Sequence, residues 1–208
     1  GDSCAVFPPQ LVTHGQYTAM RDIAARLARA LGVVGPMNVQ FAVQEGQVYV
    51  LEVNPRASRT LPFLEKATGL PLTAAATRAM LGESFAAQGI AEAALPERCY
   101  VKAPVFPFRR FPASDRLLGP EMKSTGEVMG IDREFGRAYA KAQRGAGMDL
   151  PIRGTVLVSL RDEDKASGAG ALRVLQEEGF SLVATAGTAA YMRERGLDVQ
   201  PIHKVREG

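Results

Sequence analysis

The chain has 208 residues, 46% of them hydrophobic and 23% charged, and its formal net charge is +3 at pH 7. These are ordinary values for a globular protein, so they exclude disorder and collagen-like structure, and no run approaches the ~20 apolar residues of a membrane-spanning helix. The basic residues are scattered rather than gathered into the stripe of a duplex-binding protein, so neither a membrane nor a nucleic acid is expected as a partner.

The first part of the chain is predicted to hold a helix, a β-hairpin and two shorter helices. Apolar residues recur at helical spacing over 17–31, and a glycine follows as a stop signal. Two β-rich runs, 37–43 and 48–56, surround a glycine-bearing turn and predict an antiparallel hairpin. Two further helices, each followed or ended by glycine, are expected at 61–69 and 72–81.

The middle of the chain is less regular. Residues 96–130 are rich in proline, glycine and aromatic side chains, with short strand-like pieces such as 100–106. A helix is expected at 133–143. Small residues close on a proline at 145–151, which is the best candidate for a domain boundary.

Past this boundary the pattern alternates between strand and helix. The expected order is β-α-β-α, with elements at 155–160, 165–178, 181–185 and 189–195. This alternation is typical of a parallel, Rossmann-like sheet. We therefore predict an α/β protein with two domains, 1–150 and 151–208, and expect the second to be cut short because so few residues remain to build it.

The predicted hairpin carries polar side chains where a buried strand would be apolar. Strand alternation places Glu52 and Asn54 on one face of the second strand. A three-residue loop at 45–47 would set Gln40 opposite Glu52 and bring Gln40 to the same face. A two-residue loop would set Gln40 opposite Leu51 instead, so the loop length decides whether three oxygen donors converge.

Given the first register, the hairpin could bind a divalent cation. Amide and carboxylate oxygens are hard ligands that suit Mg²⁺ or Mn²⁺, which complete their shell with phosphate oxygens and water. Arg56 and Arg59 follow on the next loop, a placement suited to phosphate or carboxylate. This arrangement suits phosphoryl transfer. On spacing alone, however, a solvent-facing sheet edge is favoured over a metal site.

Residues 37–43 followed by 52–60 closely resemble the metal-binding hairpin of the ATP-grasp family. Residues 66–69 and 118–130 resemble the large subunits of carbamoyl-phosphate synthetases, and the likeness runs over essentially the whole chain. The resemblance implies the C-terminal part of an ATP-grasp domain, an antiparallel sheet with helices, followed by the start of a methylglyoxal-synthase-like allosteric domain. It places the chain in the second of the two synthetase halves of such a subunit.

The resemblance also implies a reaction, the ATP-dependent phosphorylation of carbamate to carbamoyl phosphate for arginine and pyrimidine synthesis. Gln40, Glu52 and Asn54 would hold Mg²⁺ or Mn²⁺ between the phosphates of ATP, and Arg56 and Arg59 would neutralise the transferred phosphoryl group and its acceptor. The implied partners are ATP, carbamate or bicarbonate, ammonia and a glutaminase small subunit. Because the base-holding part of an ATP-grasp site lies upstream of such a hairpin, we expect a fragment that is inactive alone.

Five residues of the second domain are candidates for binding an effector. They lie at strand ends and helix starts: Ser159, Lys165, Thr185, Thr188 and Lys204. The crevice beyond the carboxyl ends of parallel strands is a common ligand site, and helix N-termini there favour anions. From the pattern alone, ordinary helix caps are favoured over a phosphate site. The resemblance implies that these residues bind a nucleotide monophosphate effector.

One position departs from the family pattern. Ala103 stands where these synthetases commonly have a glutamate, which in some members binds an amine-bearing activator together with an aspartate that matches Asp2. Because alanine offers no carboxylate to a cation, ornithine-type activation is not expected here.

The remaining reactive side chains are not expected to take part in chemistry. His14, in an expected loop, and His203 have no second His or Cys at ligand spacing, so surface or capping roles are expected for both. Cys4 and Cys99 are expected to be small hydrophobic residues in a reducing cytoplasm.

Two other functions stay open. The chain could be a non-catalytic regulatory module that binds a nucleotide effector, or part of another ATP-grasp carboxylate ligase such as a biotin carboxylase-like enzyme. Metal binding that is lost on changing Glu52 would favour the synthetase over the regulatory module. The β-α-β-α pattern argues against the other ligases, which have no evident need for such a domain.

Overall fold

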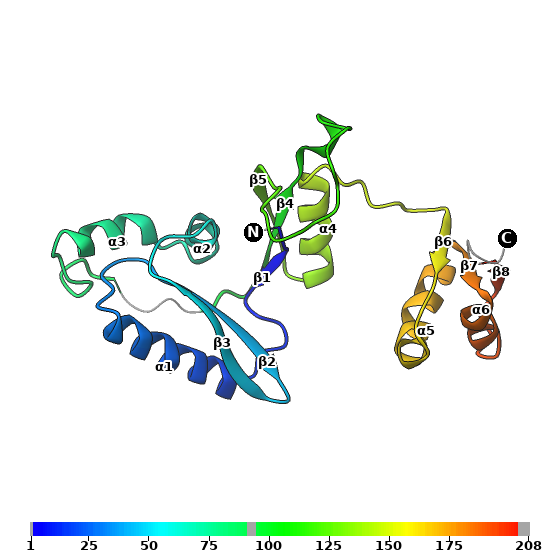
Figure 1. Ribbon diagram of the computed structural model, residues 1–208, viewed down its shortest axis with the longest axis horizontal. Coiled ribbons are helices and arrows are strands. Elements are labelled where there is room, and N and C mark those ends of the chain that lie inside the picture. The colour runs from blue at the N-terminus through cyan, green and yellow to red at the C-terminus, as the bar shows by residue number, and fades with distance from the viewer. Residues whose placement is uncertain (1, 91–94, 204–208) are drawn as a thin grey trace. The chain divides into compact units, whose positions relative to one another are not determined.

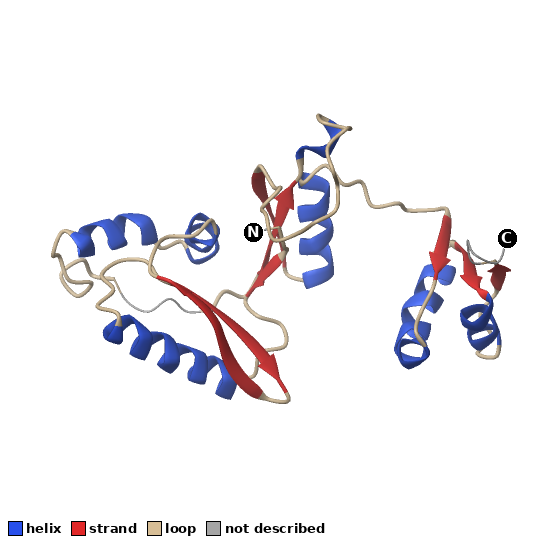
Figure 2. Cartoon of the chain, viewed as in Figure 1, coloured by secondary structure: helices blue, strands red, loops and turns tan. Residues whose placement is uncertain are grey.

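The computed structural model describes residues 2–90 and 95–203 and divides the chain into two compact units, Gly1–Asp149 and Leu150–Gly208. Figure 1 labels the elements, and Figure 2 shows the mixture of helices and strands in both units. The first unit contains a hairpin and a three-stranded sheet, both antiparallel, and the second contains a parallel three-stranded sheet. The predicted α/β fold class is therefore confirmed.

Helix α1 (His14–Ala30) begins three residues before the predicted start. Thr13 forms a capping box: its Oγ1 accepts from the backbone N–H of Gln16 at 3.3 Å, and its own N–H donates to Oε1 of Gln16 at 2.9 Å. These bonds satisfy two groups at the helix start, which stabilises the first turn. The placement of His14 in a loop was therefore wrong, because it is the first residue of the helix.

The hairpin of β2 (Asn38–Gln44) and β3 (Gln47–Asn54) has a two-residue turn, the shorter of the two loops considered from the sequence. Glu45 and Gly46 have φ angles of 50° and 79°, and two consecutive positive values match the type I′ turns favoured in such hairpins. A β-bulge in β3 then shifts the register. Leu51 is the extra residue, and the shift sets Gln40 opposite Glu52 despite the short turn.

Two short helices follow the hairpin, α2 (Thr60–Thr68) and α3 (Leu72–Met80), close to their predicted bounds. Gly69 ends α2 in the left-handed region at φ 71°, where glycine carries little strain. Arg59 is the residue directly before α2, so the start of this helix sets where Arg59 leaves the backbone.

The three-stranded sheet has the order β1-β4-β5. Its strands are β1 (Ala5–Phe7), β4 (Cys99–Val105) and β5 (Gly126–Asp132), and helix α4 (Phe135–Gly145) covers one face. The 3₁₀ helix η1 (Pro107–Arg109) follows β4. Only β4 had been expected as a strand-like piece, and α4 begins two residues after the predicted start.

Strand β4 separates a core face from a polar face. Val101 and Ala103 are each 1% exposed and pack with Ala138 and Ala142 of α4, both fully buried. Lys102 points to the opposite face because side chains alternate along a strand. Ala103 is therefore a core residue, and a carboxylate at that position would enter the contact with α4.

The second unit is a small parallel α/β layer. Its elements in chain order are β6 (Thr155–Val158), α5 (Asp162–Glu177), β7 (Ser181–Thr185), α6 (Ala186–Arg193) and β8 (Val199–Ile202). The strands lie in the order β6-β7-β8, and buried residues of β6, β7, α6 and β8 form a core with Met192 fully buried. The predicted β-α-β-α order is present, and β8 was not predicted.

Among the residues that the structure describes, no helix has both the length and the apolar character needed to cross a membrane.

Candidate active site

The hairpin brings the three predicted oxygen donors to one face. Gln40 pairs with Glu52 and Asn38 pairs with Asn54, and directly paired residues of antiparallel strands share a face. Nδ2 of Asn54 donates a hydrogen bond to Oε1 of Glu52, so these two side chains are in contact. Asn38 was not singled out from the sequence, although it lies on the same face one pair further along.

This face is chemically suited to a hard cation. Gln40 and Glu52 are exposed and Asn54 is half-buried, so their oxygens are accessible. Over the described ranges, no three His, Cys, Asp or Glu side chains gather closely enough to hold a metal ion. A cation at the hairpin would therefore depend on amide oxygens together with the single Glu52 carboxylate.

The two arginines that follow the hairpin line different hollows. Arg56 lines a small cavity of about 80 Å³ with Asn38, and its Nη1 donates to the carbonyl of Ala57 at 3.1 Å. Arg59 lines a larger cavity of about 700 Å³, and its Nη1 donates to Oγ of Ser124 at 3.1 Å. The structure thus separates the two guanidinium groups that the sequence had placed in one role.

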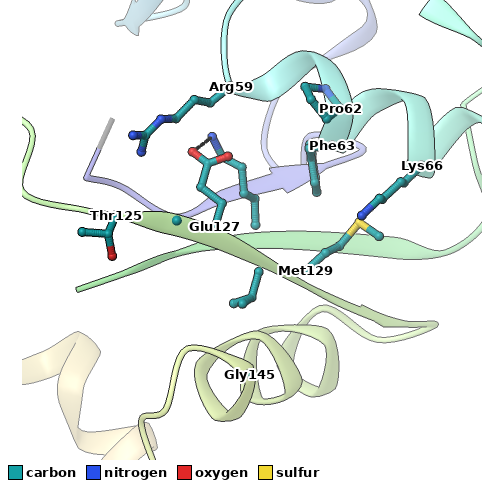
Figure 3. Close-up of a pocket in the computed structure, with 11 residues that line it drawn as sticks. Arg59, Pro62, Phe63, Lys66, Thr125, Glu127, Met129 and Gly145 are labelled. Atoms are coloured by element: carbon teal, nitrogen blue, oxygen red, sulfur yellow. Dashed lines mark hydrogen bonds and ion pairs between the residues drawn. The ribbon is translucent and has the colours of Figure 1, made fainter. Parts of the chain in front are cut away.

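The larger cavity lies between the start of α2 and strands β4 and β5 (Figure 3). Three of its lining residues are basic, Arg59, Lys66 and Lys102, and one is acidic, Glu127. In Figure 3 the Arg59 side chain and the Glu127 carboxylate lie on the same side of the hollow, with Lys66 further along α2. The excess of cations makes this hollow suited to anions.

Lys102 is the most deeply buried charge of this cavity. Its residue is 7% exposed, and Nζ donates to Oε1 of Glu127 at 3.0 Å and to Oγ1 of Thr60 at 3.3 Å. Such an ion pair needs these hydrogen bonds to offset the cost of removing both charges from water. The sequence reasoning assigned no role to Lys102 or Thr60, although strand alternation in 101–103 marks Lys102 as facing away from the core.

In the second unit, three of the five predicted effector residues lie close together. Oγ1 of Thr185 donates to Oγ1 of Thr188 at 3.4 Å, and Nζ of Lys165 donates to the carbonyl of Gly187 at 3.2 Å. Lys165 is 8% exposed and also contacts Oδ1 of Asp162 at 2.5 Å, which lowers the pKa of that carboxyl. This group of residues surrounds the turn between β7 and α6.

Two effector residues are not part of this group as the structure shows it. Ser159 is exposed after β6, and Lys204 lies outside the described residues.

Thr188 is 1% exposed and exchanges hydrogen bonds with the backbone N–H and carbonyl of Leu160 at 3.3 and 3.4 Å. Its hydroxyl therefore ties α6 to the segment that follows β6.

Two family models match separate parts of the chain. Residues 1–88 match the model described as "Carbamoyl-phosphate synthase L chain, ATP binding domain". Residues 169–208 match the "MGS-like domain" model. The first part of the chain is thus similar to an ATP-binding domain of a synthase, and the last part is similar to an MGS-like domain.

The chain is similar over its whole length to curated large chains of carbamoyl phosphate synthase. The carbamoyl phosphate synthase large chain of Pasteurella multocida is 53% identical over 208 residues, all of this chain and 20% of the relative. That of Neisseria meningitidis serogroup A is 50% identical over all of this chain and 19% of the relative. The "Carbamoyl phosphate synthase large chain, C-terminal section" of Methanocaldococcus jannaschii is 47% identical over 217 aligned residues, which cover all of this chain and 35% of that protein.

The chain therefore spans about a fifth of the full-length relatives that it matches. Over its whole length it is similar to the large chain of carbamoyl phosphate synthase, and the resemblance expected from the sequence motifs is confirmed.

Proposed function

We propose that the first unit contributes the cation- and phosphate-binding part of an ATP-dependent ligase that phosphorylates carbamate. A carbamate oxygen attacks the γ-phosphorus of ATP, the bond from that phosphorus to the bridging oxygen breaks, and carbamoyl phosphate and ADP are formed. The observation that carries this proposal is the pairing of Gln40 with Glu52, which gathers amide and carboxylate oxygens on one face. The names of the relatives support carbamate as the acceptor.

The donor set of Gln40, Glu52 and Asn54 fits Mg²⁺ or Mn²⁺, since each side chain offers an oxygen to a hard cation. Nδ2 of Asn54 faces Glu52, so the amide would rotate to present Oδ1 instead. A single carboxylate leaves much of the charge of a divalent cation uncompensated. We therefore expect tighter binding when ATP phosphates supply further oxygens, and a bound cation would neutralise charge on those phosphates.

The cationic hollow beside Arg59 suits the acceptor side of the reaction. Carbamate and the transferred phosphoryl group are both anions, and Arg59, Lys66 and Lys102 line this space. We assign Arg59 to the neutralisation of charge on the phosphoryl group as it moves to carbamate. Arg56, in the smaller hollow beside Asn38, would contact phosphate nearer the hairpin.

The proposed reaction needs groups beyond these residues. Bicarbonate, ammonia and a glutaminase small subunit would supply carbamate in the cytoplasm, for arginine and pyrimidine synthesis. Because the chain spans only about a fifth of the full-length relatives, we expect no ATP turnover by the 208 residues alone.

Titration of Mn²⁺ into the 208-residue chain, followed by electron paramagnetic resonance, tests the cation site. Glu52→Gln removes the only carboxylate of the donor set and should weaken Mn²⁺ binding by about tenfold or more, since affinity depends on ligand charge. Glu45→Gln makes the same chemical change at the exposed turn of the hairpin and should leave binding unchanged. Equal weakening in both variants would show that this face is not a cation site.

A second candidate function rests on the second unit. We propose that Lys165, Thr185 and Thr188, with Ser159 and Lys204, bind the phosphate of a nucleotide monophosphate that regulates the synthase. The bond between Thr185 and Thr188 and the bond from Lys165 to Gly187, at the end of a parallel strand, support this proposal. Calorimetry with uridylate and inosinate tests it, with Lys165→Gln expected to remove the binding heat and Lys141→Gln, in the first unit, expected to retain it.

A further inference from the structure

Arg59 is held by a residue that is distant in the sequence. Its Nη1 donates to Oγ of Ser124 at 3.1 Å, across a separation of 65 positions. Ser124 is 5% exposed, whereas Arg59, which lines the larger cavity, is exposed. A long side chain at an exposed position would otherwise sample several rotamers, so this bond selects among them.

Ser124 is itself held by Asp2. The Oδ2 atom of Asp2 accepts from the backbone N–H of Lys123 at 2.6 Å, and Oδ1 accepts from the backbone N–H of Ser124 at 3.0 Å. The Lys123 N–H, followed by the Ser124 side chain, lowers the pKa of the Asp2 carboxyl, so this group is ionised at neutral pH. The segment before β5 is thereby fixed to the start of the chain.

The hydroxyl of Ser124 can accept the hydrogen bond that Arg59 donates. A hydroxyl has one proton to donate and two lone pairs that accept. The hydroxyl oxygen of Ser124 accepts from the guanidinium of Arg59, while the backbone N–H of Ser124 donates to Asp2, so one residue contacts both charged groups. Asp2 therefore fixes the backbone of Ser124, and the hydroxyl of Ser124 in turn fixes the guanidinium of Arg59.

We propose that Asp2 and Ser124 are positioning residues that hold the Arg59 guanidinium in place for phosphoryl transfer. The catalytic part of this inference rests on the proposed function. An oriented cation stabilises developing charge without first having to reorganise, whereas a loose one must be ordered during the reaction. Loss of either positioning residue should therefore lower kcat more than it raises KM.

The positioning is tested first on the 208-residue chain by nuclear magnetic resonance of the arginine side chains. Rotation about the Nε–Cζ bond of Arg59 should become faster in Ser124→Ala and in Asp2→Asn. Because both residues act through one bond, the double variant should show no more than the larger single effect. Ser124→Thr keeps the hydroxyl and should restore slow rotation, while Ser114→Ala removes a hydroxyl that donates to the carbonyl of Phe111 and should change nothing.

Two results would overturn the positioning. One is unchanged Arg59 rotation in a folded Ser124→Ala protein. The other is additive effects of Ser124→Ala and Asp2→Asn, which would mean that the two residues act separately. Asp2 lies near the start of the chain and outside the core clusters, so Asp2→Asn keeps the test informative if Ser124→Ala fails to fold.

The kinetic test uses a full-length synthase that carries these residues, assayed for ATP formation from ADP and carbamoyl phosphate. Ser124→Ala and Asp2→Asn should each lower kcat about tenfold, the size expected for losing one hydrogen bond to a charged group. If Arg59→Ala lowers kcat but these two variants do not, Asp2 and Ser124 have no positioning role, and the catalytic role proposed for Arg59 still stands. If Arg59→Ala has no effect while Ser124→Ala still frees the guanidinium, the role proposed for Arg59 in catalysis fails and its positioning stands.

Discussion

Replacing Gly130 by alanine should sharply destabilise the first unit. A Cβ at Gly130 of β5 would lie 2.0 Å from the carbonyl oxygen of Ala138 and 2.5 Å from the backbone nitrogen of Ala142. Both atoms belong to the backbone of α4, so no side-chain rotation relieves the overlap. The helix itself would have to move away from the sheet.

The size of this movement sets the expected cost. Ordinary contacts begin at 3.4 Å, so at the 2.0 Å approach the Ala138 carbonyl must retreat by 1.4 Å. That retreat opens the packing of α4 against Val101 and Ala103, which are each 1% exposed. Overpacking typically costs ~1–3 kcal/mol where side chains adjust, so we expect ~3 kcal/mol or more here, which lowers Tm by about 6–12 °C for a unit of this size.

Gly126 provides a matched control on the same strand. An added Cβ there meets nothing within 4 Å, so Gly126→Ala should leave the stability of the unit unchanged or slightly raised. Because the two units can unfold separately, amide hydrogen exchange of β4 and β5 should accompany the thermal melt. If Gly130→Ala and Gly126→Ala melt together and exchange alike, the close approach of α4 to β5 is wrong.

Two further predictions concern the hairpin and an ion pair. Deleting Leu51 should preserve the cross-strand nuclear Overhauser effects between Gln40 and Glu52, since it removes the extra residue of the bulge; their loss would show that the bulge does not set the register. The Lys141 hydrogen bond lowers the pKa of Asp132 from 3.8 to about 2, so the stabilisation from this carboxylate is present above pH 3.8 and is lost as the pH falls through about 2. Carboxyl titration should show this value, and Lys141→Gln should return it towards 3.8, whereas an unchanged pKa would contradict the assignment.

The hairpin shows what strand alternation predicts and where it stops. The two β-rich runs and the intervening glycine are sufficient to predict both strands, since they satisfy local rules of pairing. The bulge leaves no comparable signature, because Leu51 is an ordinary strand residue with no glycine or proline beside it. The pairing of Gln40 with Glu52 therefore arises from a turn and a bulge that together replace the longer loop considered from the sequence.

The start of α1, unlike the bulge, could have been predicted, because the sequence contains a helix-capping pattern there. Thr13 and Gln16 have the spacing of a capping box, which is a local pattern. The apolar periodicity alone placed the start three residues later, since the first turn of the helix is polar and exposed. Capping residues locate a helix end better than the hydrophobic stripe does in such a case.

The polar contacts of the larger cavity can be predicted neither from strand alternation nor from local patterns such as helix caps. Lys102 meets Thr60 across 42 positions and Glu127 across 25, so no local pattern relates these residues. Alternation in β4 indicates which way Lys102 points, but only the packing of α2 and β5 shows what it meets. The sequence therefore identifies candidate groups, and the tertiary fold determines their partners.

Lys102 and Ser124 together explain how an exposed arginine can be ordered. The ammonium of Lys102 bonds to Thr60, the first residue of α2, and Arg59 directly precedes that residue. The backbone at Arg59 is thus fixed from β4, while its guanidinium is fixed from the segment before β5. Because β4 also packs against α4 through its other face, the core of the first unit and the orientation of Arg59 depend on the same strand.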